Sequence, residues 1–283
     1  MHFASSLNHV RTAALGHSTR AQLALLLLLA ASASAQFLGF DRNDYPGDAN
    51  LKTLRQTFSF TGYWLTPPPG SKSNTWTGKR SVIEQAGFGF AVLYTGKAYA
   101  QLKGSEAESI GAADGLSAAE LAKKEGFPKG TVIFLDQEEG GRMLPAQKAY
   151  LLAWIDSLSS TDYRAGLYCS GIPAKEADSG SFITTADDIK QFASDRKIVF
   201  FIANDACPPS PGCTLKPPAI TDTATPYADI WQLAQSPRRS PYSDACAKTY
   251  SADGNCYPPG SKLHVDLDVA TSADPSHGRT LKP

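Results

Sequence analysis

Neither an excess of one charge nor a membrane-spanning hydrophobic run is present in this 283-residue sequence. Lys+Arg and Asp+Glu stand at 27 each, which argues against a surface that binds nucleic acid. With 42% apolar and 19% charged residues, the composition also excludes an intrinsically disordered chain. The longest apolar run, 23–30, is far shorter than the roughly 20 residues that a transmembrane helix needs. The composition is that of a globular protein.

Histidine is scarce after the first 17 residues. His264 and His277 remain, 13 positions apart, with no Cys or other His spaced near them as metal ligands would be. Ser/His and Cys/His nucleophiles need histidine as well, and no G-x-S-x-G motif occurs. We therefore expect no metal and no other cofactor, and peptidase or esterase activity is disfavoured.

The N-terminus has the features of a secretory signal peptide. Arg11 and Arg20 precede the apolar run 23–30, which ends in small residues with an A-x-A site at 31–35. We predict that 1–35 is removed and that 36–283 is one secreted or periplasmic domain; a retained anchor is the alternative. The mature chain would have a net charge of about −2, because 1–35 contains two of the basic residues and no acidic ones. A monomer that binds neither nucleic acid nor membrane is expected.

All five cysteines lie after residue 35. In a secreted protein the close pairs Cys207/Cys213 and Cys246/Cys256 predict two disulfides, each closing a short loop. Cys169 is left over in an apolar run, which predicts a buried, reduced thiol.

Eight short apolar runs bounded by turn residues predict eight strands. They span 38–41, 58–65, 88–94, 131–136, 163–170, 198–203, 229–234 and 263–269. Their starts are 20 to 43 residues apart, close to the length of a βα unit, so we expect parallel strands. Helical patterns occupy 117–125, 144–158 and 185–194.

The segments 206–228 and 236–262 are rich in Pro, Ser, Asp and Cys and lack an apolar helical face, which predicts long loops. The pattern favours one α/β domain, a (β/α)8 TIM-type barrel whose last helices are reduced or replaced by disulfide-containing loops. An open doubly wound sheet is the alternative. It is disfavoured because no Gly-rich phosphate loop follows the first strand.

Carboxylates recur where the predicted strands end, and a barrel builds its active site there. Asp136 and Glu138 are two positions apart on the fourth strand, so both side chains should face the barrel mouth. Mutual repulsion can keep one of them protonated and the other ionised, which is the division that glycoside hydrolysis needs. An acidic solvated turn is the other interpretation, and it weakens because Asp41 and Asp266 lie at comparable positions.

Aromatic residues at the same strand ends are candidates for stacking on sugar rings, namely Tyr63, Trp64, Tyr94, Tyr168 and Trp231. Together with the neighbouring amide, the predicted binding residues are Tyr63, Tyr94, Trp231 and Gln232. Core packing is the alternative for each aromatic side chain.

Several segments resemble the strand-end motifs of the family 25 glycoside hydrolases, which are secreted lysozyme-type muramidases with a β/α barrel. The motifs are Gly39-Phe40-Asp41, Leu135-Asp136-Gln137-Glu138, Trp231-Gln232 and Val265-Asp266-Leu267-Asp268. The chain is more similar to a bacterial group of secreted glycoside hydrolase-like domains related to that family, through GFDRNDYPG, TGYWLTPPP, FGFAVLYTG, YRAGLYCS and WQLAQ. The resemblance covers about 38–270.

The resemblance implies that Glu138 is the general acid and Asp136 its partner carboxylate, with Asp41 and Asp266 in the same pocket. It also implies hydrolysis of a cell-wall or related N-acetylated glycan, assisted by the acetamido group of the substrate. The alternative is a catalytically inactive barrel that binds glycan at the cell envelope. A pure binding module gains nothing from two carboxylates that repel each other, so the four acids favour the enzyme.

Overall fold

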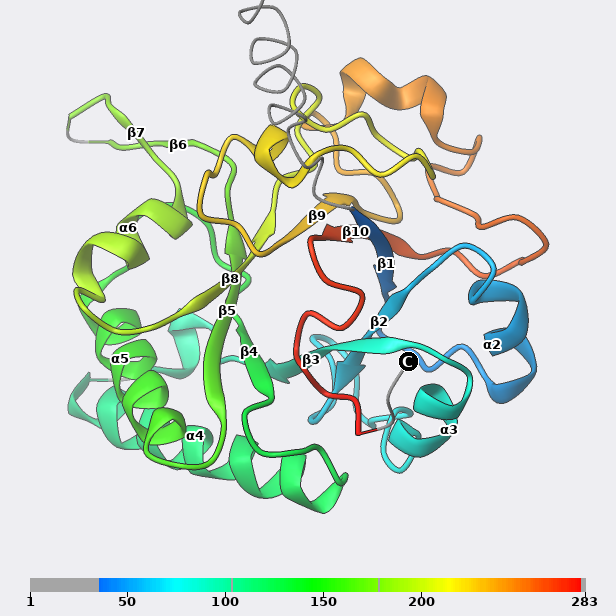
Figure 1. The fold of residues 1–283 in the computed structure, drawn as a ribbon. Coiled ribbons are helices and arrows are strands. Elements are labelled where there is room, and N and C mark those ends of the chain that lie inside the picture. The colour runs from blue at the N-terminus through cyan, green and yellow to red at the C-terminus, as the bar shows by residue number, and fades with distance from the viewer. Residues whose placement is uncertain (1–35, 103, 178, 281–283) are drawn as a thin grey trace, which may run out of the picture. The chain divides into compact units, whose positions relative to one another are not determined.

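The computed structural model describes residues 36–102, 104–177 and 179–280 (Figure 1). The predicted signal peptide, 1–35, lies outside these residues. Among the helices of the described residues, none combines the length and the apolar character needed to cross a bilayer.

Eight strands close into a barrel in the order β1, β10, β9, β8, β5, β4, β3, β2. They are β1 (Phe37–Asp41), β2 (Phe60–Trp64), β3 (Gly89–Thr95), β4 (Val132–Asp136), β5 (Arg164–Ser170), β8 (Val199–Ala203), β9 (Ile230–Ala234) and β10 (Asp266–Ala270). Each predicted apolar run forms one of them, and the predicted TIM-type barrel is confirmed. A two-stranded ribbon, β6 (Ala174–Lys175) and β7 (Phe182–Ile183), lies outside the barrel.

Aromatic side chains fill the barrel beneath its mouth. Phe134 on β4 and Phe201 on β8 come from strands that are not neighbours, yet their ring centroids are 5.7 Å apart, so both point inward. Phe201 also packs edge-on against Tyr168, at 5.0 Å. All three side chains are buried. The mouth therefore has a dry, apolar floor on which polar groups can be held.

Helices cover the outside of the barrel. They are α2 (Asp48–Leu54), α3 (Arg80–Gln85), α4 (Ala107–Lys124), α5 (Pro145–Ser159) and α6 (Thr185–Phe192), with short 3-10 turns at Tyr99–Gln101, Gly104–Glu106, Ile220–Thr223 and Asp244–Thr249. The patterns at 144–158 and 185–194 correspond to α5 and α6, whereas α4 begins ten residues before its predicted start. The helices α2 and α3 were not predicted.

Strand β10 runs antiparallel to both of its neighbours, which corrects the prediction of an all-parallel barrel. The chain leaves β9 at the barrel mouth, and 235–265 contains no α-helix that would carry it to the other end. It stays at the mouth, where the Ser236 N–H donates to Asp266 at 2.6 Å. The strand therefore enters the barrel from the mouth, and its first residue, Asp266, lies opposite Asp41.

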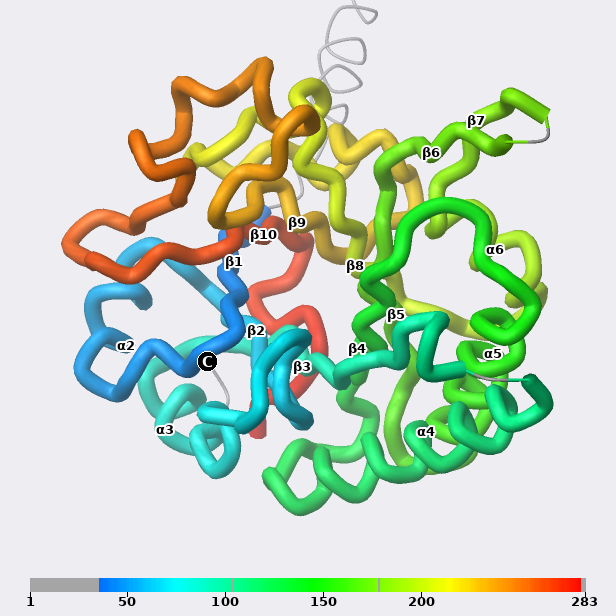
Figure 2. Tube along the Cα trace, turned by 180° about the vertical axis from the view of Figure 1, so that it is seen from behind, coloured from blue at the N-terminus to red at the C-terminus, as the bar shows by residue number. Residues whose placement is uncertain are grey.

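The predicted disulfide pairing is wrong. The structure joins Cys207 to Cys246 and Cys213 to Cys256, with Cα atoms 5.9 and 5.5 Å apart. Each bridge links the loop after β8 to the loop after β9, because the two loops lie side by side (Figure 2). Where two loops pack on each other, cysteines close in sequence need not be the ones that form a disulfide. The predicted free, buried Cys169 is confirmed.

The segment 271–280 crosses the end of the barrel away from the mouth. Ser276 lies between β3 and β4: its N–H donates to the Phe90 carbonyl and its carbonyl accepts from the Val132 N–H, each at 2.8 Å. Its hydroxyl oxygen accepts from the Val92 N–H, also at 2.8 Å. These bonds replace strand pairing where β3 and β4 separate, since their ladder begins only at Val92 and Ile133.

Candidate active site

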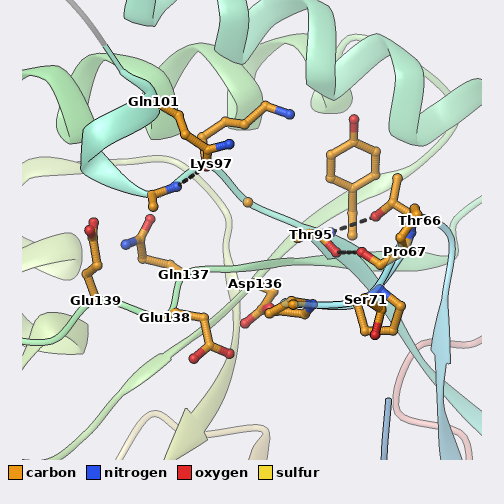
Figure 3. A pocket seen from close by; sticks show the side chains of 16 residues that line it. Thr66, Pro67, Ser71, Thr95, Lys97, Gln101, Asp136, Gln137, Glu138 and Glu139 are labelled. Carbon is orange, nitrogen blue, oxygen red and sulfur yellow. Dashed lines mark hydrogen bonds between the residues drawn. The ribbon is translucent and has the colours of Figure 1, made fainter. Parts of the chain in front are cut away.

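Two connected hollows open at the carboxyl ends of the strands. The deeper one, about 230 Å³, lies over the barrel axis and contains Asp41, Asp136, Glu138 and Asp266. The wider one, about 510 Å³, runs between the loops 66–71 and 95–101 (Figure 3). Pro69, Asp136 and Glu138 line both hollows, so they form one groove with the acidic cluster at its deep end.

Asp136 and Glu138 meet on the floor of this groove. Strand β4 ends at Asp136, so Glu138 reaches the groove from the following turn and not by strand alternation. Asp136 is 3% exposed, and no described N–H or O–H group donates to either of its carboxylate oxygens. Burial, followed by the charges of Glu138 and Asp41, holds the pKa of Asp136 well above its usual range. Glu138 is solvent-exposed.

Glu139 is turned away from this pair, as Figure 3 shows. Its carboxylate accepts from the Tyr99 N–H at 2.9 Å and from the side-chain amide of Gln147 on α5. Two fixed donors therefore give this carboxylate a structural role, although it lines the wider hollow.

Asp41 and Asp266 form the other side of the cluster and are paired across β1 and β10. Burial raises the pKa of Asp41 to about 6, with a further contribution from Glu138. Burial and the charge of Asp41 raise the pKa of Asp266 well above its usual range. Gly62 leaves room for Asp41, because a Cβ at position 62 would lie 2.6 Å from the Asp41 Cβ.

Gln232 links the carboxylates to the neighbouring strand. Its amide nitrogen donates to Asp41 at 2.7 Å, and its amide oxygen accepts from the Tyr168 hydroxyl at 2.7 Å and from the Gln235 amide at 2.6 Å. The two donors fix the amide so that its N–H groups face the acids. Gln235 was not singled out from the sequence; the motif WQLAQ, which contains it, was the available signal.

Comparison with family models identifies the chain. Residues 60–206 match the model of the Rv2525c-like, glycoside hydrolase-like domain. The chain belongs to this family. The matched region includes Asp136 and Glu138, whereas Asp41, Gln232 and Asp266 lie outside it. No curated protein matches the chain.

Solved structures with the same fold have low sequence identity to this glycoside hydrolase-like domain. An uncharacterized protein from B. stearothermophilus is 21% identical, with a TM-score of 0.54 over 83% of this chain and 95% of that one. The Tat-secreted protein Rv2525c from Mycobacterium tuberculosis is 13% identical, with a TM-score of 0.51 over 83% and 95%. The catalytic domain of endolysin ply40, from bacteriophage P40 of Listeria monocytogenes, is 15% identical, with a TM-score of 0.51 over 87% and 98%.

Two of the three predicted aromatic contacts, Tyr63 and Trp231, need correction in this glycoside hydrolase-like domain. Tyr63 and Trp231 are fully buried. The hydroxyl of Tyr63 donates to Glu125, and the indole N–H of Trp231 donates to the Asn204 carbonyl at 2.8 Å. Tyr94 borders the wider hollow, but it is 4% exposed and its hydroxyl donates to Asp114 on α4 at 3.2 Å. These rings pack the barrel wall, because their side chains lie on the outward face of their strands.

The cluster supports acid–base chemistry. Within 36–102, 104–177 and 179–280, no group of three or more His, Cys, Asp or Glu side chains could hold a metal ion. The deep hollow combines a buried carboxyl whose pKa is raised, an exposed neighbouring acid and two further acids. Such a set can donate a proton to a leaving group and stabilise positive charge on a sugar ring.

Proposed function

We propose that this domain is a glycoside hydrolase that cleaves a cell-wall or related N-acetylated glycan. The observation that carries the proposal is the contact between a buried, unpartnered Asp136 and an exposed Glu138 at the deep end of an open groove. Burying a carboxyl without a hydrogen-bond donor costs stability, and acids with pKa values raised in this way cluster at functional sites.

In the proposed reaction, the pair supplies one proton. Burial favours that proton on Asp136, and Glu138 lines the same hollow beside it. The proton passes to Glu138 and then to the glycosidic oxygen as the bond from that oxygen to the anomeric carbon breaks. Asp136 is then ionised and orients the acetamido group of the substrate, whose oxygen attacks the anomeric carbon. Water then attacks the same carbon and breaks its bond to the acetamido oxygen, and the proton that the water releases returns through Glu138 to Asp136. Asp41, Asp266 and Gln232 bind the sugar.

Several features support a secreted protein acting on peptidoglycan. Two disulfides are typical of an oxidising compartment, in line with removal of 1–35 and release of 36–283 to the periplasm or the medium. The fold shared with an endolysin catalytic domain makes peptidoglycan the first glycan to test. We propose that the mature domain works as a monomer.

Glu138→Gln tests the assignment, because it keeps the shape and hydrogen bonding of the side chain but removes the transferable proton. We expect the clearing of a purified peptidoglycan suspension to slow by at least about a hundredfold, the usual scale of general acid catalysis. Glu139→Gln is the matched control and should retain most of the activity, because this carboxylate is bonded to Tyr99 and Gln147. Full activity of Glu138→Gln would refute the role of Glu138. Wild-type protein that binds glycans but cleaves none across a polysaccharide panel would indicate the inactive glycan-binding barrel.

A further inference from the structure

Besides Asp41 and Asp136, the barrel contains a buried acid, Asp268, that the proposed reaction does not use. Asp268 on β10 lies in register with Gly39 on β1 and with Gln232 on β9. Its side chain is fully buried, and no N–H or O–H group in the described part of the chain donates to either of its oxygens. An ionised carboxylate in that position would lack both water and a donor, at a large cost in free energy.

Asp268 is a diagonal neighbour of Asp41 across β1 and β10, because Asp41 lies opposite Asp266 and Gly39 lies opposite Asp268. The two carboxyls interact with each other. Two carboxylates offer only acceptors, so this contact is a hydrogen bond only if one of the groups is protonated. Asp41 already accepts from the Gln232 amide at 2.7 Å and borders the deep hollow. Asp268 has neither an amide donor nor contact with the hollow to stabilise a negative charge, so the proton belongs on Asp268.

We propose that Asp268 carries a proton at neutral pH and donates it in a hydrogen bond to Asp41, which keeps Asp41 ionised and fixed in the site. Asp268 is thus a positioning residue. Its effect on turnover rests on the proposed hydrolase function, whereas its protonation does not.

The groups around this pair also disfavour a negative charge on Asp268. Asp266 on the same strand and the ionised Asp41 on β1 both oppose a negative charge on Asp268. Strand β9 offers Gln232, a neutral amide that is already bonded to Asp41. On strand β2, the ring of Phe60 packs against Gly39, since a Cβ added at position 39 would lie 2.2 Å from it. This ring has no hydrogen-bond donor to offer Asp268.

The protonation state can be measured without an activity assay. The infrared difference spectrum of wild type minus Asp268→Asn at pH 7 should contain the carbonyl band of a protonated carboxylic acid. The melting temperature of Asp268→Asn minus that of the wild type should also be more positive at pH 7 than at pH 4. At pH 7 only the wild type must keep a proton on residue 268 that its unfolded chain releases. Absence of the band, or an equal difference in melting temperature at both pH values, would overturn the proposal.

The role toward Asp41 is tested by two variants on whichever glycan the wild type cleaves. Asp268→Asn still donates an N–H to Asp41, so the acidic limb of its pH–activity profile should stay near that of the wild type. Asp268→Leu has a similar volume but no donor, and its acidic limb should move to higher pH by about one unit. Identical limbs in the two variants would refute the positioning role. If the wild type cleaves nothing, the proposed function fails while the infrared and melting results still decide the protonation.

Discussion

At position 62, the absence of a side chain decides how closely β2 approaches Asp41. Gly62→Ala would place a Cβ 2.6 Å from the Asp41 Cβ and 3.3 Å from its Cα, and neither atom can yield without moving β1. We expect the glycan-cleaving activity to fall at least about tenfold, since a shift of the order of 1 Å in a reacting group can cost a hundredfold in rate. The measurement is kcat/KM on the cleaved glycan, with thermal melting to confirm folding.

Gly140→Ala is the matched control for this substitution. Position 140 lies close to Glu138 in sequence, and a Cβ there would meet nothing nearer than Ser170, at 3.9 Å. It should leave activity within about twofold of the wild type, because no group of the site has to move. Equal losses in both variants would show that any added methyl group near the groove disturbs it, and the specific argument for Gly62 would fail.

The acids of the site could be predicted from the sequence, whereas its aromatic contacts could not. An acid at the end of an apolar strand has no structural use, so the positions of Asp41, Asp136 and Asp266 in the sequence are enough to indicate a site. For an aromatic residue at the end of a strand, the sequence does not show whether its side chain packs in the core or lines the site. Only the register of the strand in the barrel shows that Tyr63 and Trp231 face outward and that Tyr168 faces the acids.

The loops 204–229 and 235–265 act as one cross-linked unit at the barrel mouth. Besides the two disulfides, Arg239 after β9 forms a bidentate ion pair with the buried Asp205 after β8, at 2.6 and 3.1 Å. The bridges close 39 and 43 residues of chain. Closure entropy at that length corresponds to about 4 kcal/mol for each bridge.

Removing one bridge with the pair Cys213→Ala and Cys256→Ala should therefore lower the melting temperature by roughly 8–15 °C. Far-ultraviolet circular dichroism at 25 °C should stay close to that of the wild type, because the barrel ladders do not include these residues. Glycan binding should weaken, since the loop beginning at Ser236 contacts Asp266. Loss of barrel secondary structure together with binding would instead assign the loops to the folding core.

At the scale of elements, spacing predicted the eight strands but not the direction of the last one. A connection of about thirty residues between two strands is long enough for a crossover to the other end of the barrel. Its length does not show whether the chain makes that crossover. The missing helical pattern in 236–262 was the available sign that it does not. The helices α2 and α3 were missed because seven and six residues are too few to show a period.

The whole molecule should be more stable in mild acid than at neutral pH. The pKa values of Asp41, Asp136, Asp266 and Asp268 are all raised in the folded state, mainly by burial. A group with a raised pKa contributes stability at low pH and loses it as the pH rises through the folded value. For Asp41, whose pKa is about 6, the gain between pH 7 and pH 5 is about 1 kcal/mol.

The melting temperature should accordingly rise by at least about 3 °C from pH 7 to pH 5. Asp136→Asn should flatten this dependence, because an amide replaces one of the carboxyls that must stay protonated. A melting temperature that falls over the same interval would contradict the raised pKa values.

The insertion of Ser276 between β3 and β4 has a consequence for protein synthesis. Strand β10 closes the barrel against β1, and the segment that follows it supplies the bonds that β3 and β4 lack at their far ends. Both contacts join the first strands to residues far along the sequence. The barrel thus cannot close until residues 266–280 have left the ribosome. Contacts between such distant parts of a chain are typical of a topology that folds slowly.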